Sequence, residues 1–330
     1  MKAQKDYFVT FTAPEKAELV AVDRDTKPLA TNEVAGKTVA SVISQGTELA
    51  IYKKTSGQPT KTGYAAVFKV EEVGAEVTKV KPGDIAFCMG NHGSYQRHTQ
   101  DRIVRVPGGL SAETAVFARL MGISMSTLVT TTARPPQKVI VTGLGIVGHL
   151  AAKIFQHCGY DVTACDPAPA RREIALKTGI KNVLPAVPVD DPEIAGHVAL
   201  VVECSGHEQG VLDACKVVQK RGEVAMIGVP WERKTEILAH ELLYVIFHKY
   251  VVLRSGWEWE LALQETEFRT GSIFGNFAGA LKWLAEGSIK VDGLYAKVSP
   301  KDPQKIYKGM LDRTFTDLTA VFDWASFMKA

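Results

Sequence analysis

The chain has 330 residues, of which 46% are hydrophobic and 23% charged, and its 39 Lys and Arg against 36 Asp and Glu leave a formal net charge of +3. This length is enough for two domains with buried cores. The composition excludes a disordered or low-complexity chain, and the charge lacks the basic blocks of a nucleic-acid or anionic-membrane binder.

The five cysteines are odd in number and widely spaced, and no two of them are separated by two residues. This pattern is not typical of a disulfide framework or of a structural zinc site. The first twenty residues lack the apolar core of a signal peptide, and no apolar run is long enough to cross a bilayer. We therefore expect a cytoplasmic protein with neither a membrane nor a nucleic acid as a partner.

Short alternating segments separated by Gly and Pro fill the first third of the chain and predict a β-rich unit. The expected strands are 17–22, 37–44, 65–74 and 84–90. Residues 111–131 then change to a helical pattern that begins at Ser111, a favourable N-cap residue. We expect two helices in this segment, with a break near Gly122.

From Lys138 onward, apolar strand patterns alternate with helical ones. The expected strands are 138–143, 160–166, 198–206, 222–230 and 250–257, with helices over 146–158, 169–178 and about 277–285. Repeated β-α-β units with nearly continuous apolar strands predict an α/β fold in which helices cover both faces of a doubly wound parallel sheet. A last strand is expected near 318–322.

The sequence GLGIVG, residues 143–148, lies between a predicted strand and a predicted helix. A G-x-G-x-x-G motif at that place is typical of a dinucleotide site. Gly143 permits the tight turn, Gly145 lets the backbone approach a pyrophosphate, and Gly148 lets helix and strand pack closely. The amides at the start of the helix, at Ile146 and Val147, are then expected to bind the phosphates.

Asp166 ends the next predicted strand, 23 residues after Gly143. This is close to the spacing of about 20 residues expected for the acidic residue that binds the adenosine ribose. A carboxylate there would repel a 2′-phosphate, so the sequence favours NAD(H) as the cofactor. Arg171 and Arg172 follow closely and could neutralise such a phosphate. We interpret them as solvated helix residues, and Arg171 also counts among the candidate cofactor contacts.

Several motifs together resemble the medium-chain dehydrogenase/reductases over essentially the whole chain. Residues 63–74 (GYAAVFKVEEVG) are similar to the family's glycine-led strand, residues 80–84 (VKPGD) to its K-x-G-D turn, and residues 201–206 and 225–230 to two strands of its nucleotide domain. Residues 44–48 (SQGTE) resemble a zinc-free branch that includes bacteriochlorophyllide-type dehydrogenases.

This resemblance implies a Rossmann dinucleotide-binding domain at residues 120–257 and a β-rich, GroES-like catalytic domain formed by residues 1–119 and 258–330. It also implies that residues near the carboxyl ends of the later Rossmann strands contact the cofactor. These are Ser205, Gly228, Val229 and Ser255. The strand at 250–257 commonly pairs across a two-fold axis in the family, so a homodimer is expected.

Zinc-dependent members of the family hold their catalytic metal through two cysteines and a histidine. The corresponding positions here are Gln45, Tyr64 and Met121, whose side chains are poor zinc ligands. The four-cysteine lobe of those enzymes is missing as well. The resemblance therefore implies that neither catalytic nor structural zinc is bound.

Four side chains are candidates for handling the substrate proton without zinc. Tyr64 could donate to a substrate oxygen, or it could only fill the volume vacated by the metal. Thr47 matches a proton-relaying hydroxyl or bonds its own loop. Glu48 is carried by the branch motif, and it could instead pair with an interior arginine such as Arg119. His92 lies on a glycine-flanked loop, where an imidazole could act as acid or base or be incidental.

These residues together indicate a zinc-independent, NAD(H)-dependent oxidoreductase. It would transfer a hydride between nicotinamide and a secondary alcohol or ketone, with a polyol, a sugar-like molecule or a secondary metabolite as substrate. An NADPH-dependent quinone or enone reductase is the alternative enzyme. A non-catalytic NAD(H)-binding protein is the third hypothesis.

Overall fold

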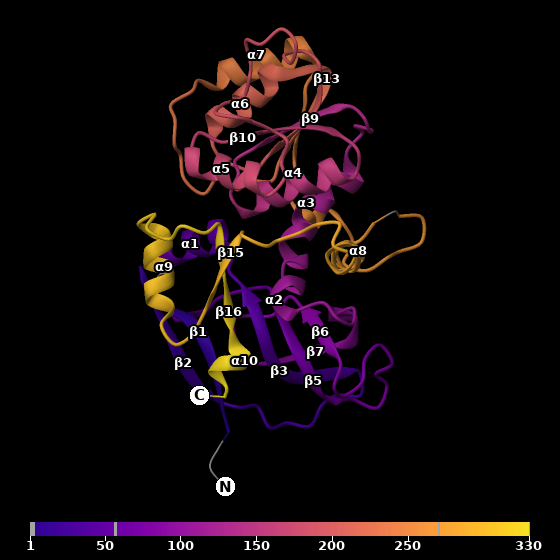
Figure 1. Ribbon diagram of the computed structural model, residues 1–330, viewed down its shortest axis with the longest axis vertical. Helices are drawn as coiled ribbons and strands as arrows, with labels where there is room; N and C mark the ends of the chain where they lie inside the picture. The colour runs from indigo at the N-terminus through magenta and orange to yellow at the C-terminus, as the bar shows by residue number, and fades with distance from the viewer. Residues whose placement is uncertain (1–3, 56–57, 270, 330) are drawn as a thin grey trace. The chain divides into compact units, whose positions relative to one another are not determined.

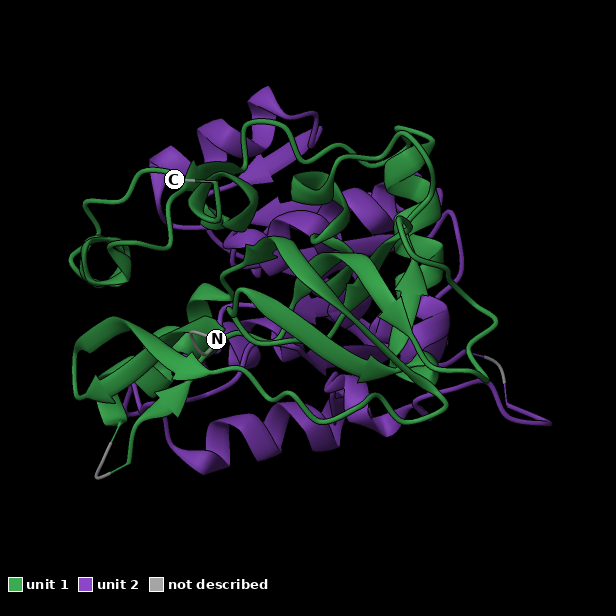
Figure 2. Ribbon diagram, turned by 90° about the horizontal axis from the view of Figure 1, so that it is seen from below, with its two compact units in different colours: residues 1–119, 277–330 green, residues 120–276 purple. Residues whose placement is uncertain are grey.

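The computed structural model describes residues 4–55, 58–269 and 271–329. The chain divides into two compact units, drawn in different colours in Figure 2. The first unit comprises residues 1–119 and 277–330, and the second comprises residues 120–276. The unit boundaries fall within two helices, α3 (Ala118–Thr130) and α8 (Ile273–Ala285).

Two sheets form the first unit. An antiparallel sheet has the order β2-β1-β4, and a larger one has the order β15-β16-β3-β5-β6-β8, with β7 also paired to β3. The strands are β1 (Lys5–Ala13), β2 (Lys16–Asp23), β3 (Glu33–Val42), β4 (Thr60–Lys61), β5 (Ala66–Val73), β6 (Ile85–Cys88), β7 (Tyr95–Thr99), β8 (Ile103–Arg105), β15 (Tyr295–Val298) and β16 (Thr319–Asp323). Because β16 pairs antiparallel to β3, the C-terminal segment completes a sheet that the N-terminal segment begins (Figure 1).

Short helices surround these sheets. They are α1 (Gln45–Lys54), α2 (Ala112–Ala115), α9 (Pro303–Leu311), α10 (Trp324–Phe327) and the 3₁₀ turn η1 (Gln100–Arg102). The sequence analysis did not identify β1 or α1. The β-rich first unit itself is confirmed.

The second unit contains a six-stranded parallel sheet with the order β11-β10-β9-β12-β13-β14. Its strands are β9 (Lys138–Thr142), β10 (Asp161–Cys165), β11 (Asn182–Leu184), β12 (Val198–Glu203), β13 (Val218–Met226) and β14 (Val252–Ser255). Its helices are α4 (Ile146–His157), α5 (Pro169–Lys177), α6 (Glu208–Val217), α7 (Ala239–Lys249) and the 3₁₀ turn η2 (Glu258–Glu260). This is the doubly wound order of a dinucleotide fold. From β9 the chain adds β10 and β11 on one side, and it then returns to the other side of β9 to add β12, β13 and β14.

Two apolar clusters cover the opposite faces of this parallel sheet. Phe155 of α4 and Ala175 of α5 pack against one face, and Cys215 of α6 with Leu242 of α7 pack against the other. All residues of the central strand β12 are buried. The predicted sheet with helices on both faces is confirmed.

The expected break near Gly122 is wrong. The first helix of this segment, α2, ends at Ala115, and α3 begins at Ala118, so that Gly122 lies inside α3. The Gly122 carbonyl there accepts a hydrogen bond from Ser126 Oγ at 3.0 Å. A buried helix tolerates a glycine because packing outweighs its propensity cost of about 1 kcal/mol. Across the described ranges, no helix is long and apolar enough to span a bilayer.

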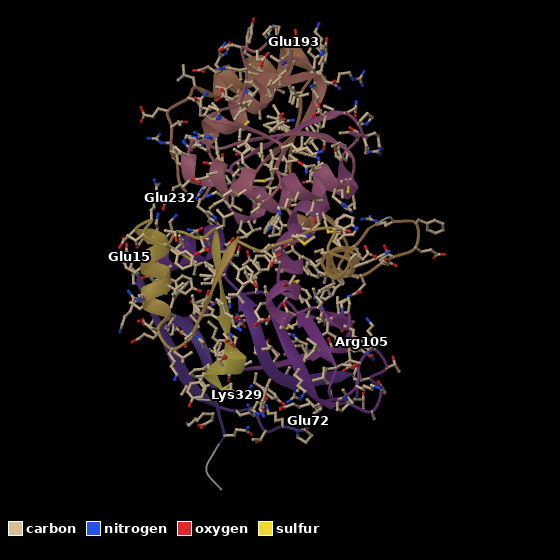
Figure 3. All side chains as sticks on the ribbon, viewed as in Figure 1. Glu15, Glu72, Arg105, Glu193, Glu232 and Lys329 are labelled. Atoms are coloured by element: carbon tan, nitrogen blue, oxygen red, sulfur yellow. The ribbon has the colours of Figure 1, made fainter. Side chains whose placement is uncertain are left out.

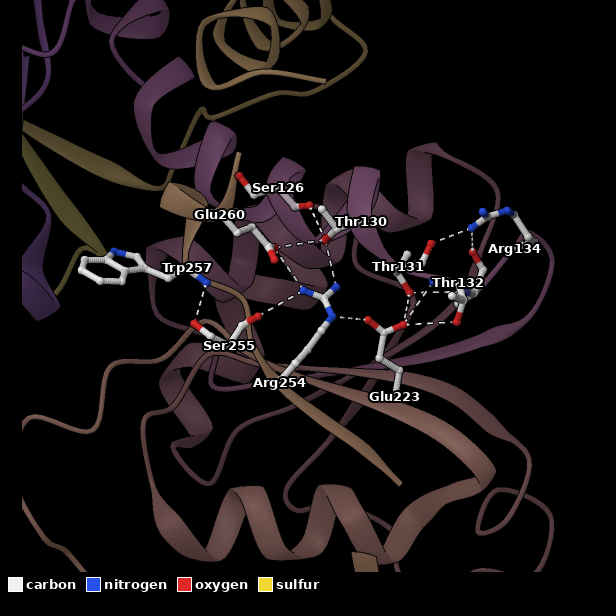
Figure 4. A network of polar contacts seen from close by, with 11 residues as sticks. Ser126, Thr130, Thr131, Thr132, Arg134, Glu223, Arg254, Ser255, Trp257 and Glu260 are labelled. Atoms are coloured by element: carbon white, nitrogen blue, oxygen red, sulfur yellow. Dashed lines mark hydrogen bonds and ion pairs between the residues drawn. The ribbon is translucent and has the colours of Figure 1, made fainter. Parts of the chain in front are cut away.

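Arg254 on β14 joins several elements of the second unit (Figure 4). Its guanidinium lies 2.5 Å from Glu223 on β13, 3.1 Å from Glu260 in η2, and 2.9 Å from Thr130 Oγ1 at the end of α3. Glu223 also accepts from Thr131 Oγ1 at 2.7 Å. The network holds residues 258–260 within the second unit, although the resemblance groups them with the C-terminal domain. The charged residues labelled in Figure 3 are exposed.

A buried carboxylate lies where several segments of the first unit meet. Glu48 in α1 is 1% exposed. Its Oε2 accepts hydrogen bonds from Thr62 Oγ1 at 2.9 Å and from Tyr307 Oη in α9 at 2.5 Å, and it lies 3.1 Å from His92 Nε2. Its Oε1 accepts the Ser44 amide at 2.7 Å. Since Tyr307 is 259 residues from Glu48 in the chain, this carboxylate connects the N-terminal and C-terminal parts of the unit.

Burial by itself would raise the pKa of Glu48. The charge and hydrogen bond of His92, with the hydrogen bonds from Tyr307 and the Ser44 amide, hold that pKa below its usual range. Burial, together with the adjacent carboxylate, raises the pKa of Tyr307 well above its usual value. The carboxylate is therefore ionised at neutral pH and the Tyr307 phenol is neutral.

The fold should lose stability in acid through Glu48. A carboxyl group whose pKa is lowered by folding stabilises the fold above its unfolded pKa, and this contribution is lost as the pH falls through the folded pKa. We expect the free energy of unfolding to fall as the pH drops below about 4.5. Glu48→Gln should cost about 3 kcal/mol at neutral pH and flatten this dependence, because it removes the charged partner of a buried network. Urea unfolding at pH 7 and pH 4 measures both effects.

The matched control is Glu71→Gln in the same unit. Glu71 pairs with Lys37 at 2.9 Å, and the two side chains are 33% and 49% exposed. Its replacement should change stability by less than about 0.5 kcal/mol at either pH, because exposed ion pairs contribute little. Equal unfolding curves for the two variants would contradict the assigned role of Glu48.

Candidate functional site

The glycine-rich turn of the second unit follows β9 and opens α4. Gly143 has a φ of 80°, and a Cβ there would lie 2.8 Å from the backbone of Ser205. At Gly148, a Cβ would lie 1.8 Å from the carbonyl oxygen of Gly143, so a side chain would push the helix away from the turn. A Cβ at Gly145 would meet nothing within 4 Å, which leaves room beside the helix. Such a turn suits a phosphate group.

Ile146 and Val147 form the first turn of α4, where backbone amides have no partner within the helix. Ile146 is 4% exposed, so its side chain belongs to the core. The Val147 carbonyl accepts Ser124 Oγ at 3.3 Å. The amides of these residues, rather than their side chains, are therefore the groups suited to bind an anion.

Asp166 ends β10 beside the glycine-rich turn. Its Oδ2 accepts the Leu144 amide at 2.7 Å and its Oδ1 accepts the Ala168 amide at 2.8 Å, and the side chain is 2% exposed. Arg171 lies 3.4 Å from Oδ2 and is 44% exposed, whereas Arg172 donates to the Asp166 carbonyl at 2.8 Å. The Asp166 carboxylate thus braces the turn, and Arg171 is the more accessible charged group beside it.

Glu203, which the sequence analysis did not single out, ends β12 and is completely buried. Its carboxylate accepts hydrogen bonds from Thr142 Oγ1 at 3.2 Å, from the Ser205 amide at 2.8 Å and from the Gly206 amide at 3.2 Å. The Ser205 hydroxyl donates to it as well. Burial raises the pKa of Glu203, and these donors oppose the rise. The sequence feature that could have identified Glu203 is an acidic residue at the end of an otherwise apolar strand.

The loops after β12 and β13 pack closely on each other. The Glu203 carbonyl accepts the Gly228 amide at 2.7 Å, and a Cβ at Gly228 would lie 2.2 Å from the Gly206 nitrogen. Val229 is 44% exposed beside this contact. The structure thus gathers Gly143, Ser205, Gly228 and Val229 at one edge of the sheet. Ser255 lies further along that edge, at the end of β14, where its Oγ accepts the Trp257 amide at 3.1 Å.

In the first unit, Tyr64 is half-buried beside the start of α1. Its hydroxyl donates to Ser44 Oγ, and Thr47 in the first turn of α1 also hydrogen-bonds it. The Arg119 guanidinium carbon lies 4.7 Å from the centre of the Tyr64 ring. Burial raises the pKa of Tyr64, whereas the Arg119 charge and the two hydroxyl contacts lower it. Ser44 is a further polar residue of this cluster that the SQGTE pattern contains.

Glu48 and His92 lie apart from solvent. Glu48 pairs with His92 rather than with Arg119, so the expected arginine partner is wrong. His92 is fully buried: its Nδ1 lies 2.8 Å from Ser41 Oγ, and its ring packs edge-on against Phe322. His92 is therefore not an accessible imidazole on a surface loop, because the glycine-flanked loop places its side chain in the core.

The two first-unit positions that the resemblance aligns with zinc ligands carry a phenol and an amide side chain. Tyr64 has an aromatic hydroxyl with two hydroxyl neighbours, and the adjacent motif provides the amide of Gln45. Nowhere in the described ranges do three His, Cys, Asp or Glu side chains form a group that could hold a metal ion. Zinc in proteins is bound by such side chains.

Comparisons with known proteins relate this chain to dehydrogenases. Residues 147–266 match the family described as zinc-binding dehydrogenase. An alcohol dehydrogenase of Geobacillus stearothermophilus is 25% identical over 210 residues, which cover 53% of this chain and 62% of that protein. An NADP-dependent alcohol dehydrogenase C of Mycolicibacterium smegmatis is 26% identical over 230 residues, covering 56% and 65%. The chain thus spans somewhat less than two thirds of the length of these relatives.

Among solved structures, galactitol-1-phosphate dehydrogenase of Escherichia coli is similar with a TM-score of 0.81. The likeness covers 96% of this chain and 99% of that one at 16% sequence identity. At this identity it shows the fold. The matched family and these relatives show that the chain is similar to alcohol dehydrogenases, and the likeness to the solved structure shows the fold.

Proposed function

We propose that this protein is a zinc-independent, NAD(H)-dependent oxidoreductase that interconverts a secondary alcohol and a ketone. The observation that carries the proposal is the glycine-rich turn beside the β9/β12 junction of the parallel sheet, where Asp166 braces this turn and Glu203 braces the neighbouring loop after β12. Ligands of open α/β sheets bind at such a junction, beyond the carboxyl ends of the strands. The named relatives act on alcohols or polyols.

The second unit would hold the dinucleotide through its backbone and loop residues. The amides of Ile146 and Val147 would bind the pyrophosphate, and Ser205, Gly228 and Val229 would line the same edge. When bound, the nicotinamide supplies or accepts the hydride. The protein's own task is to orient the substrate and to manage one proton.

Tyr64 is the proposed proton donor in the absence of zinc, with Thr47 and Ser44 as its hydroxyl partners. Zinc would polarise the substrate oxygen in a metal-dependent enzyme, and a neutral phenol can do so by hydrogen bonding. Gln45 and Tyr64 provide no zinc-binding set, and this supports metal-independent chemistry. Glu48 and His92 would act by holding α1 in place.

Turnover should not need zinc. We expect NADH to bind with a Kd in the micromolar range, about −8 kcal/mol. Oxidation of a panel of secondary alcohols and polyols, measured by NADH absorbance, should persist after chelation, and elemental analysis should find no stoichiometric zinc. One zinc per chain, lost together with activity on chelation, would refute the proposal. Tight NADH binding without turnover on any alcohol, ketone, quinone or enone would favour a non-catalytic NAD(H)-binding protein.

The cofactor preference rests on Asp166 against Arg171. A buried carboxylate at the ribose end opposes a 2′-phosphate, and this supports NAD(H). The exposed guanidinium of Arg171 favours the second candidate, an NADPH-dependent quinone or enone reductase, because it could pair with that phosphate.

NADH should bind at least about tenfold more tightly than NADPH, a difference of about 1.4 kcal/mol. Arg171→Ala should weaken NADPH binding further and leave NADH binding within about twofold, because NADH carries no 2′-phosphate for the guanidinium to pair with. Fluorescence titration measures both constants. Lys177→Ala, at the exposed end of α5, is the control and should alter neither. Tenfold tighter NADPH binding in the wild type would instead support the reductase.

A homodimer is proposed through α7 and the edge strand β14. Every residue of α7 is at least partly exposed, and Leu243, Tyr244 and Phe247 are 63%, 55% and 77% exposed. Tyr250 and Val252 extend this apolar face to β14, whose ladder partner in the described sheet is β13 alone. Large exposed apolar patches beside an open sheet edge favour association of two copies.

Light scattering should give twice the 35.9 kDa mass of the chain. Phe247→Glu should shift the protein to monomers, because a charge on this face would be buried in the dimer. Phe268→Glu, at a residue that is 98% exposed outside the face, should leave the dimer intact. A wild-type monomer at micromolar concentration would exclude the proposed interface.

A further inference from the structure

The aromatic ring of Tyr64 lies beneath a buried cation. The guanidinium carbon of Arg119 is 4.7 Å from the Tyr64 ring centre and 5.5 Å from that of Phe277, and Arg119 is 4% exposed. An arginine stacked in a water-poor place interacts more strongly with a neighbouring charge than one in water. The pair is therefore electrostatically coupled.

The other groups facing the phenol come from α1 and the residue before it. Ser44 and Thr47 hydrogen-bond the hydroxyl, and the Glu48 carboxylate lies nearby within the same segment. Burial raises the pKa of Tyr64, Arg119 and the two hydroxyls lower it, and Glu48 raises it again. The phenol is thus neutral at neutral pH, and Arg119 is the one positive charge among these neighbours.

We infer that Arg119 is a positioning residue that enables Tyr64 to give up and recover a proton, by stabilising the phenolate that forms when the proton leaves. The inference rests on the proposed function for the role of Tyr64 in turnover. It assigns Arg119 a role different from the expected pairing with Glu48.

In the reducing direction, the substrate carbonyl gains a hydride and a proton. A bound reduced nicotinamide would supply the hydride, with its two electrons, to the carbonyl carbon. The carbon–oxygen π pair moves to oxygen, which takes the Tyr64 proton and completes the alcohol. The phenolate left under Arg119 then regains a proton from water, with Ser44 and Thr47 as its hydrogen-bond donors meanwhile.

The chain offers a matched comparison in the same unit. The Arg24 guanidinium carbon lies 3.8 Å from the Tyr95 ring centre, and Arg24 pairs with Asp6 at 2.6 Å. This second stacked arginine lies in another part of the unit. Tyr95→Phe therefore controls for the loss of a stacked phenol as such.

The first test is a phenolate titration followed by ultraviolet absorbance, without cofactor or substrate. The difference between wild type and Tyr64→Phe isolates Tyr64 among the nine tyrosines. Arg119→Met should raise the pKa of Tyr64 by about one unit or more, as removal of a close opposite charge does. Arg119→Lys should recover most of the shift, and Ser44→Ala, which retains the cation, should move it less. An unchanged titration in folded Arg119→Met would overturn the inference.

The second test is the pH profile of kcat/KM. Tyr64→Phe should lower kcat/KM at least about 100-fold, and Tyr95→Phe should leave it unchanged. Arg119→Met should move the basic limb upward in step with the titration, with KM for NADH unaltered. If Arg119→Met does not fold, the same comparison is made with Arg119→Lys and Ser44→Ala. A basic limb of kcat/KM that does not follow the Tyr64 titration in either variant overturns the inference. Absence of wild-type turnover alongside a shifted titration would instead reject the proposed function alone.

Discussion

The Glu48 carboxylate is the interaction on which the first unit depends. It binds donors from the residue before α1, from the segment before β5, from the loop before β7 and from α9, and the C-terminal strand β16 pairs with β3 in the same unit. An ionised carboxylate without those donors would be costly in the core, so their presence specifies one arrangement of the discontinuous unit. The same network fixes α1, which carries the hydroxyl groups beside Tyr64.

Two inward-facing carboxylates have a comparable effect in the second unit. Asp166 and Glu203 each accept backbone amides from the loops at the carboxyl ends of the strands. Rigid loops at this edge reduce the conformational entropy lost on binding a dinucleotide. The hydrogen bonds of these two buried side chains therefore hold the loops in shape, while the glycines allow the backbone to come close.

Much of the second unit could be predicted, because its signals are local. Gly143 and Gly148 occupy positions where a Cβ would collide with backbone. The glycines of the motif are therefore required by the turn itself. The first unit was harder. Helix α1 has no obvious amphipathic pattern in its sequence. Its buried Glu48 is hydrogen-bonded by Tyr307 and Thr62, which come from other segments of the chain. The break between α2 and α3 lies before the glycine because packing, not propensity, sets it.

His92 and Arg119 show, within the candidate site, the same difference between what residue identity indicates and what the tertiary structure decides. Their residue types made both candidates for chemistry or for ion pairing, but only the tertiary structure decides that His92 faces the Glu48 carboxylate and that Arg119 covers the Tyr64 ring. The sequence by itself determined the parallel sheet and its glycine-rich turn, since each depends on neighbouring residues or residue identity. The partners of buried charges were decided by the tertiary structure, because they come from segments far apart in the chain.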